Sequence, residues 1–368
     1  MEENRPDGTV AVPSKRNDGI DLLRIVCMYM VVVLHVIGQG GILVRVSSHI
    51  WSYHMCWLME TFCFCTVNVY GMISGYVGVK QRFRLSRIVR TWVLVYFWTA
   101  VIGVVLLAAN PSWVDRESLL SVFLPVTWDT YWYATDYIAL LLLMPFLNRM
   151  VEALTDKQRG WLMNVIFIYT AWMFIPKVFS DDFLEMIGGY SLIWLILLYM
   201  FGACMRMKGP GRRPVSWYLM VYVVTALVSW GAKLGIESVT QQLLGEPKYG
   251  RLLLNYTAPT ILICAWALIN VFSQLQLAEG IRRIVRLMTP AAFGVYLIHA
   301  HPLIWEHILK LAFFEYRHFS AWQMIPAVLL TALGIFVPCL LLSWCQTRLF
   351  AVLKVPERIE ALCRRVHL

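Results

Sequence analysis

Two ionisable residues, Arg24 and His35, lie eleven positions apart in the first apolar segment of the chain. Eleven residues of an α-helix make almost three whole turns, so both side chains share one face and stand about 16 Å apart. Ionisable side chains inside a membrane segment face a polar interior rather than lipid. Histidine changes protonation near neutral pH, which suits a general base. The spacing therefore indicates chemistry or transport within a membrane.

Both residues also have structural explanations. Arg24 can extend to the inner membrane surface and pair with Asp21, three residues earlier. A lone histidine in a membrane is more often an interhelical hydrogen bonder than a catalyst. Glu60, in the second apolar segment, lies at roughly the depth of His35, where an unpaired carboxylate is costly. It could orient His35 as the carboxylate of a catalytic triad does, or make a structural bond. We predict Arg24, His35 and Glu60 as the catalytic group.

The elements that must position these residues are apolar segments long enough to cross a membrane. The chain has 368 residues, 59% hydrophobic and 15% charged, whereas a soluble domain carries about 25% charged residues. A membrane-spanning helix needs about 20 apolar residues. Ten such segments occur, at 19–40, 52–79, 91–109, 131–148, 161–177, 185–205, 216–235, 252–276, 291–310 and 322–350. The predicted fold is an all-α, polytopic membrane helix bundle of about ten transmembrane helices, with a transmembrane domain at 19–351 and tails at 1–18 and 352–368.

Charge is distributed unequally between the predicted loops. Basic residues gather in one set of alternate loops, and acidic residues collect in the other set. The positive-inside rule then places both termini in the cytoplasm. The same bias explains most of the net charge of +10 without invoking nucleic acid. The longest outer loop, about 110–130, contains an amphipathic stretch at 116–124 that is predicted to lie on the membrane surface.

Cysteines and the N-terminus indicate little chemistry. The nine cysteines are scattered without a CxxC pair, so no metal site is predicted. The polar residues 1–18 precede an apolar segment of full spanning length without a small-residue cleavage site, so no cleaved signal peptide is expected.

Three arginines, Arg84, Arg87 and Arg90, follow the second apolar segment at three-residue spacing. Such spacing places them along one side of a helix. Guanidinium groups bind phosphate through two parallel hydrogen bonds, so the cluster suits a phosphate-rich ligand such as coenzyme A. The alternative is an anchor for lipid head groups, which the loop alone favours.

Aromatic, hydroxyl and acidic side chains gather at 127–136, at the outer mouth of the fourth segment. Tryptophan and tyrosine at a membrane interface are usually anchors, but this set could equally form a rim that stacks on carbohydrate. In the ninth segment, His299 is either a residue of the donor channel or a packing hydrogen bonder. The candidates for the rim are Trp128, Asp129, Trp132, Tyr133 and Asp136.

These motifs resemble those of the acyltransferase-3 family of bacterial integral-membrane acyltransferases. The pair Arg24 and His35 is similar to the family's Arg-x10-His signature. The segment Ser74-Gly75-Tyr76 is similar to its Ser-Gly-Tyr element, and 84–87 or 87–90 to its Arg-x-x-Arg element. Later blocks at 131–148 and 296–299 follow in the family's order.

The resemblance implies a membrane-bound O-acyltransferase of the bacterial inner membrane. It implies transfer of an acyl group, usually acetyl, from cytoplasmic acetyl-CoA or another acyl-CoA to a hydroxyl of a cell-surface carbohydrate or lipid-linked glycan. It also implies that Arg24 and His35 are catalytic and that 84–90 helps to hold the donor, with Ser74 and His299 assigned to the same donor site. His35 would act as the base or carry the acyl group briefly, and Arg24 would stabilise the oxyanion or position the donor.

The expected partners are acyl-CoA, the glycan acceptor and membrane lipid, but no nucleic acid, and a homo-oligomer is left open. No permanently bound cofactor is expected. Because Arg24 and His35 lie about 16 Å apart, they cannot both touch one carbonyl, so a channel bridged by the donor's pantetheine arm is predicted. The main alternative is a proton-coupled transporter or flippase, since buried ionisable groups also form proton paths. A third hypothesis is that the protein is a membrane sensor or scaffold.

Overall fold

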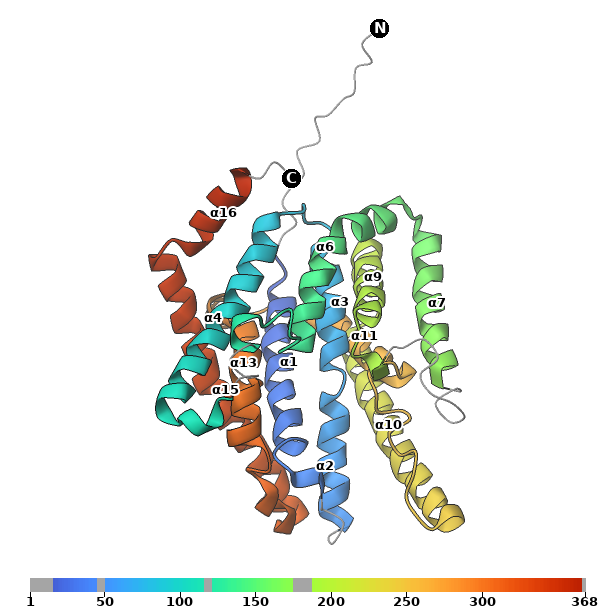
Figure 1. The fold of residues 1–368 in the computed structure, drawn as a ribbon. Coiled ribbons are helices and arrows are strands. Elements are labelled where there is room, and N and C mark those ends of the chain that lie inside the picture. The colour runs from blue at the N-terminus through green and yellow to red at the C-terminus, as the bar shows by residue number, and fades with distance from the viewer. Residues whose placement is uncertain (1–15, 45–49, 116–120, 175–186, 366–368) are drawn as a thin grey trace.

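A computed structural model describes residues 16–44, 50–115, 121–174 and 187–365 (Figure 1). Across these residues the protein is helical and contains no strand, which confirms the predicted all-α class. Six candidate spans are long and apolar enough to cross a membrane, or seven if one bent pair of helices is a single span. The six are α1 (Asp18–Ile37), α2 (Ile50–Cys63) continued by α3 (Thr66–Gly78), α4 (Leu85–Ala109), α6 (Trp132–Ala153), α10 (Val215–Leu244) and α15 (Ala321–Val352).

The four remaining predicted segments also contain helices, but these are shorter, broken or more polar. They are α7 (Asp156–Phe174), α9 (Leu192–Lys208), α11 (Pro259–Ser273) and the bent pair formed by α12 (Glu279–Met288) and α13 (Ala292–His299) with α14 (Pro302–Ile304). The number of ten spans and the cytoplasmic position of both termini therefore stay predictions. Most of the amphipathic stretch predicted at 116–124, like most of the tail 1–18, lies outside the described residues.

Short helical turns connect these helices, and one surface helix follows the last of them. The helix α16 (Val355–Arg365) falls in the predicted C-terminal tail and packs against α4. It lies at the same end of the bundle as the first described residues (Figure 1). The turns are η1 (Ile42–Val44), η3 (Pro111–Trp113), η4 (Ile187–Gly189), η5 (Thr289–Ala291), η6 (Trp305–Leu309) and η7 (Phe314–His318).

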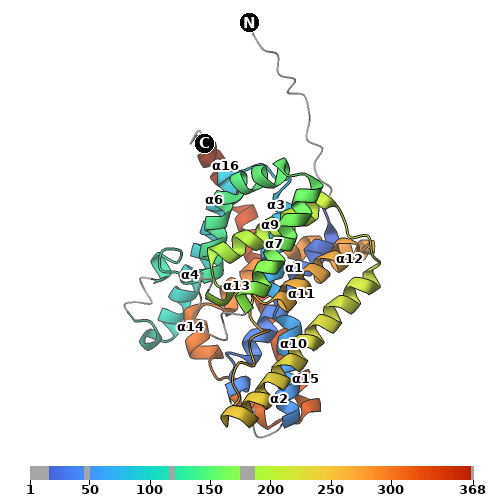
Figure 2. The ribbon, with the colours of Figure 1, turned by 90° about the vertical axis from the view of Figure 1, so that its right-hand side faces the viewer.

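Helix α1, which holds both Arg24 and His35, is a central element of the bundle (Figure 1, Figure 2). It contacts α2, α3, α11, α12, α13 and α15. Its start is fixed by Asn17, whose side-chain oxygen accepts from the backbone amide of Ile20 and whose amide group donates to the backbone oxygen of Ser273. A helix that is apolar nearly all round is buried by its neighbours. By contrast, α4, α10 and α15 expose aliphatic side chains along their outer faces, as lipid-facing helices do.

Small residues bring α3 and α9 close together. Gly71 and Gly75, one turn apart on α3, face Leu198 and Tyr199 of α9, and Gly202 of α9 faces the backbone of Met72. Without a hydrophobic driving force between helices in lipid, such small residues allow the close backbone contact on which association depends. We call this contact between the glycines of α3 and α9 the seam. Tyr70 and Ser74, the neighbouring residues on α3, line an interior cavity.

We expect the substitution Gly75→Ala to destabilise the protein by about 1–3 kcal/mol, because the added Cβ would overlap the backbone oxygen of Tyr199 and force the two helices apart. The measurement is the thermal unfolding midpoint of the purified protein in detergent. Gly235→Ala is the matched control, since nothing lies within 4 Å of a Cβ added there in α10. Equal midpoints for the two variants would contradict the proposed role of this seam.

Candidate active site

A cavity of about 810 Å³ opens near the start of α1, at the end of the bundle where α16 lies. We call it the arginine cavity, because Arg16, Arg24, Arg87 and Arg206 line it, whereas Asp21 is its one acidic lining residue. Four guanidinium groups around one carboxylate give the cavity an excess of positive charge. Arginine binds phosphate and carboxylate groups through paired hydrogen bonds. The cavity therefore suits an anionic, phosphate-bearing ligand.

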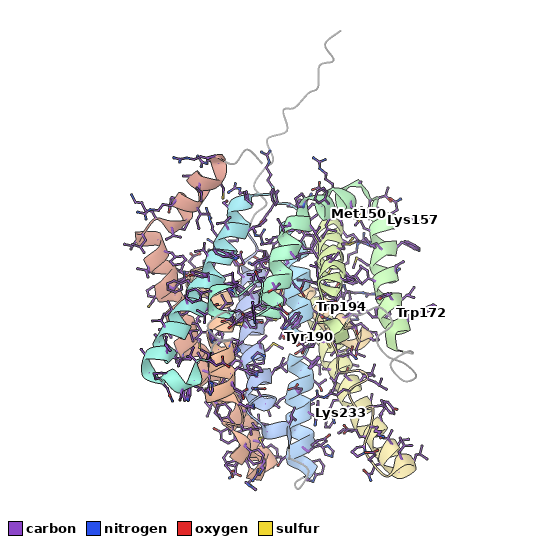
Figure 3. All side chains as sticks on the ribbon, viewed as in Figure 1. Met150, Lys157, Trp172, Tyr190, Trp194 and Lys233 are labelled. Atoms are coloured by element: carbon purple, nitrogen blue, oxygen red, sulfur yellow. The ribbon has the colours of Figure 1, made fainter. Side chains whose placement is uncertain are left out.

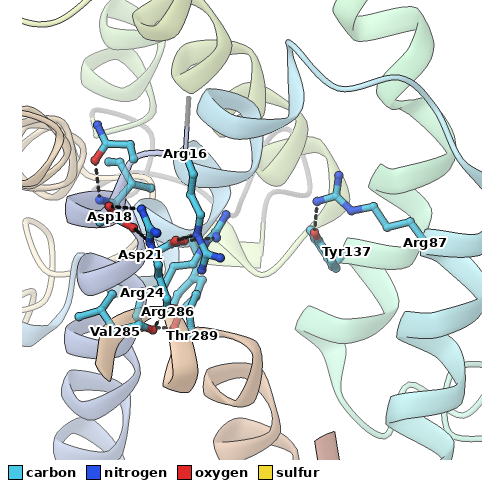
Figure 4. Close-up of polar contacts among 12 residues, drawn as sticks. Arg16, Asp18, Asp21, Arg24, Arg87, Tyr137, Val285, Arg286 and Thr289 are labelled. Carbon is cyan, nitrogen blue, oxygen red and sulfur yellow. Dashed lines mark hydrogen bonds and ion pairs between the residues drawn. The ribbon is translucent and has the colours of Figure 1, made fainter. Parts of the chain in front are cut away.

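Arg24 pairs with an acidic neighbour and also lines the arginine cavity. Its Nη1 donates to Oδ1 of Asp21 over 2.9 Å, and Arg16 pairs with the other oxygen of that carboxylate (Figure 4). This is the structural pairing that the sequence offered as an alternative. Arg24 nevertheless lines the arginine cavity, with 26% of its side chain exposed. Asp21 thus holds the guanidinium group at the cavity wall.

The three arginines at 84–90 do not line one common cavity. Arg87 donates to the hydroxyl of Tyr137 over 3.0 Å and lines both the arginine cavity and an adjoining one of about 360 Å³ (Figure 4). Arg84 lines only the second, since it precedes α4 in an extended conformation. Arg90 lines neither cavity and instead donates to Glu360 of α16 over 2.8 Å. A helical face was predicted for all three, but the helix begins at Leu85, so Arg84 is outside it.

A third cavity, of about 320 Å³, lies further along α1, and we call it the histidine cavity. Its polar lining includes His35, Glu60 and Arg251. The arginine cavity and the histidine cavity have common lining residues, so they adjoin. Those shared residues are Tyr70, Tyr133 and Phe293. Much of the remaining wall is aromatic and includes Phe64, Trp132, Tyr190, Tyr256, Tyr296 and Trp305.

His35 is held by a second histidine. Nδ1 of His35 lies 2.9 Å from Nε2 of His299, and Nδ1 of His299 lies 2.6 Å from the backbone oxygen of Val295. A carbonyl oxygen only accepts, so Nδ1 of His299 carries a proton, and in the neutral ring Nε2 is the acceptor. The shared proton then belongs to Nδ1 of His35. This assignment leaves Nε2 of His35 with its lone pair, as a general base requires.

The ring of His35 is also fixed by an aromatic neighbour. Trp305 packs edge-on against it, with ring centroids 4.6 Å apart. Among the described residues, none hydrogen-bonds to Nε2 of His35, and the histidine lines the cavity while His299 is buried behind it. The basic nitrogen is therefore available to a ligand in the histidine cavity.

Glu60 shares this cavity but does not hold His35. It is only 7% exposed, and its Oε2 has no hydrogen-bond partner in the described part of the chain. Glu60 was predicted to orient His35 or to make a structural bond, whereas the described partner of Nδ1 of His35 is His299, a residue assigned from the sequence to the donor site. Ser74, assigned to that site too, lines the arginine cavity and donates to the backbone oxygen of Tyr70 over 2.8 Å.

The predicted carbohydrate rim divides into two groups. Trp132 and Tyr133, at the start of α6, line the histidine cavity, and Trp132 packs on Tyr190. Figure 3 places Tyr190 near the middle of the molecule and Met150, towards the end of α6, near one end. Helix α6 therefore begins in the interior, which takes these two aromatic residues inward. The other rim candidates, Trp128, Asp129 and Asp136, line none of the cavities described here.

Several lining residues were not singled out from the sequence as site residues. Arg16, Arg206 and Arg251 entered only as basic loop residues, because nothing in their local pattern differs from a positively charged anchor. Tyr70, one turn before Ser74, was not singled out either, yet its hydroxyl donates to the backbone oxygen of Arg24 over 2.5 Å. It joins α3 to α1 between the two cavities.

Comparison with protein families matches residues 17–344 to the acyltransferase domain of the acyltransferase-3 family. No curated protein matches the chain in a sequence comparison, and no solved structure matches it either. The matched range includes His35, His299 and every lining residue of the arginine cavity and the histidine cavity except Arg16. The protein therefore belongs to the acyltransferase-3 family and is a membrane acyltransferase.

Proposed function

We propose that the protein moves an acyl group, most often acetyl, from acyl-CoA to a hydroxyl of a carbohydrate or lipid-linked glycan at the surface of a bacterial inner membrane. The observation that carries this proposal is the pair of adjoining cavities, one basic and one built around the free nitrogen of His35. A basic cavity suits the phosphates of the donor, and a polar, aromatic cavity with a base suits the reacting groups.

The donor would bind with its phosphates in the arginine cavity. Arg16, Arg87 and Arg206 supply guanidinium groups there. The pantetheine arm would pass Tyr70, Tyr133 and Phe293 and bring the thioester into the histidine cavity. Because Arg24 lines the arginine cavity and not the histidine cavity, its position supports a role in holding the donor rather than in stabilising the oxyanion.

In the histidine cavity the acceptor hydroxyl would attack the thioester carbonyl carbon as its proton passes to Nε2 of His35. The carbon–sulfur bond then breaks, and the proton moves from His35 to the thiolate, which leaves as the thiol of CoA. The hydrogen bond from Nδ1 of His35 to Nε2 of His299 favours the protonated His35 ring that forms between the two steps. This bond strengthens because its donor has gained charge. His299 is thus a positioning residue and His35 the catalytic base.

Acyl transfer is tested directly with the purified protein in detergent and acetyl-CoA that carries a labelled acetyl group. We expect CoA thiol to be released and the label to pass to a hydroxyl acceptor in an envelope extract, or to water when none is added. A transporter, flippase or scaffold would bind without consuming the thioester. Intact acetyl-CoA after prolonged incubation with well-folded protein would overturn the proposal.

We expect Arg87→Ala to raise the KM for acetyl-CoA about tenfold, since a charge-assisted hydrogen bond to phosphate contributes about 1.5–3 kcal/mol and each 1.4 kcal/mol is a factor of about ten. Arg90→Ala is the matched control on the same helix, because Arg90 binds Glu360 and lines neither the arginine cavity nor the adjoining cavity of about 360 Å³. The measurement is initial rate against donor concentration. Equal KM values for the two variants would contradict donor binding in the arginine cavity.

A further inference from the structure

An open depression of about 390 Å³ lies where the loop after α10 returns towards α11. We call it the outer vestibule, and its lining includes Trp57, Glu237, Tyr249, Arg251 and Asn255. Arg251 also lines the histidine cavity, so the two spaces adjoin at this side chain. The predicted carbohydrate rim contributes no residue to the outer vestibule.

The outer vestibule lies towards the end of the molecule opposite the arginine cavity. Figure 3 places Lys233, one turn before Glu237 on α10, below Tyr190 and far from Met150 and Lys157. The histidine cavity therefore has a neighbouring space on each side. One neighbour is the arginine cavity, and the other is the outer vestibule.

A buried cation fixes two walls of the outer vestibule. The Lys233 side chain is fully buried, and its Nζ donates to Oε2 of Glu237 over 2.6 Å and to the Tyr53 hydroxyl over 2.7 Å. The same ammonium group lies 4.0 Å from the ring centroid of Trp57. Burying a charge is expensive unless it is paired in this way. The network therefore holds a carboxylate and an indole ring in fixed positions in the wall of the outer vestibule.

The loop that completes the outer vestibule is equally constrained. Tyr249 has a positive φ of 59°, a conformation that is rare for residues other than glycine and that occurs where surrounding structure imposes it. Its ring is 47% exposed. At Gly250 an added Cβ would overlap the Glu237 carboxylate, so the loop lies directly on that side chain. An exposed aromatic ring is thus held beside fixed polar groups.

The junction with the histidine cavity contains an incomplete polar site. Glu60 is buried and lines the cavity with Arg251, while its Oε2 has no partner among the described residues. A buried acceptor left without a donor loses about 1–3 kcal/mol, which a ligand hydroxyl would recover. Arg251 supplies donors at the same junction, and its guanidinium group lies 5.0 Å from the Trp57 ring centroid.

We propose that the outer vestibule and Glu60 form the binding site for the acceptor, a sugar residue with several hydroxyls. The sugar reaches the histidine cavity past Tyr249 and Arg251, donates one hydroxyl to the Glu60 carboxylate and presents another to Nε2 of His35. Fixed aromatic, acidic and guanidinium groups match the alternating apolar and hydroxyl faces of a sugar, whereas a lipid chain would leave those polar groups unpaired. The inference rests on the proposed function.

The test compares Arg251→Ala and Tyr249→Ala with Trp128→Ala, the last from the alternative rim. Base-released acetate from the envelope of cells that make each variant reports acceptor acylation with the natural acceptor. Stabilisation of each purified variant by acetyl-CoA reports the donor site. We expect acetate to fall at least tenfold for Arg251→Ala and Tyr249→Ala, with donor stabilisation unchanged and Trp128→Ala like the wild type. Full acetate in the first two variants, or loss of donor stabilisation with Arg251→Ala, would overturn the assignment.

Chemical labelling of a cysteine in the outer vestibule distinguishes a blocked acceptor site from a variant that fails to fold. In cells that make Tyr249→Cys, a bulky membrane-impermeant maleimide added from outside should stop further acetylation, while the wild type treated alike continues. Continued acetylation of the fully labelled variant would overturn the proposal. If the wild type itself adds no acetate and shows no response to acetyl-CoA, the proposed function fails, and this outcome differs from all the others.

Discussion

Replacing His35 with alanine is expected to lower the rate of acyl transfer by a factor of about 10²–10⁴, the range that a positioned general base contributes. In the neutral tautomer that these hydrogen bonds favour, Nε2 of His35 keeps its lone pair and faces the histidine cavity as a base. The KM for acetyl-CoA should change little, because the arginine cavity that would hold the phosphates is intact. The measurement is transfer of labelled acetyl with donor binding followed in parallel.

Two controls make this result specific. His318→Ala removes an exposed histidine at the end of η7 and should leave the rate unchanged. Added imidazole should restore part of the activity of His35→Ala, since the substitution leaves room for it. A rate within a few-fold of the wild type would rule out His35 as the base. Acetyl that is retained on the wild-type protein but not on His35→Ala, after brief mixing with the donor, would instead show that His35 carries the acyl group.

The sequence was sufficient to place Arg24 and His35 on one stripe of a buried helix. Helical periodicity and the cost of charge in lipid are local rules, and both apply to α1 without knowledge of its neighbours. Their separation predicted a channel with distinct donor and reacting regions. In the structure they line separate cavities that meet at Tyr70, Tyr133 and Phe293.

Contacts between distant segments could not be read from the same rules. His299 lies 264 positions from His35, and nothing in the sequence, which left His299 as a donor-channel residue or a packing hydrogen bonder, indicated that the two rings meet. The role of Arg90 depends on Glu360, which is 270 positions away. Glu60 was predicted at roughly the depth of His35, and both line the histidine cavity, but the helix rotation that decides which atom Glu60 meets is set by tertiary packing. Such pairings can be identified only once the tertiary structure is known.

The fold class followed from composition and segment length, yet those two signals do not fix the number of spans. Helices α9 and α11 are short, and the bend of 55° after α13 breaks another segment. A non-helical backbone at membrane depth is tolerated only where protein or water surrounds it. That bend follows His299 and leads to Trp305, so the irregular segment contributes to the histidine cavity.

Replacing His299 with alanine is expected to lower kcat about 10²-fold while leaving the KM for acetyl-CoA unchanged. The substitution removes the acceptor that keeps the proton of His35 on Nδ1, so the ring can turn and can adopt the tautomer that blocks Nε2. In serine proteases the wrong tautomer of a catalytic histidine lowers kcat about 10⁴-fold, and the smaller loss expected here reflects the retained contact between His35 and Trp305.

His299→Gln distinguishes positioning from a structural role. The glutamine oxygen can accept from Nδ1 of His35, so this variant should recover most of the lost kcat, whereas His299→Leu fills a similar volume without an acceptor and should behave as the alanine variant. Thermal unfolding midpoints identify any variant that is simply unstable. If glutamine, leucine and alanine lower kcat equally in folded protein, the hydrogen bond does not position the base. If all three retain full kcat, His35 acts without its partner and the two-histidine arrangement is packing alone.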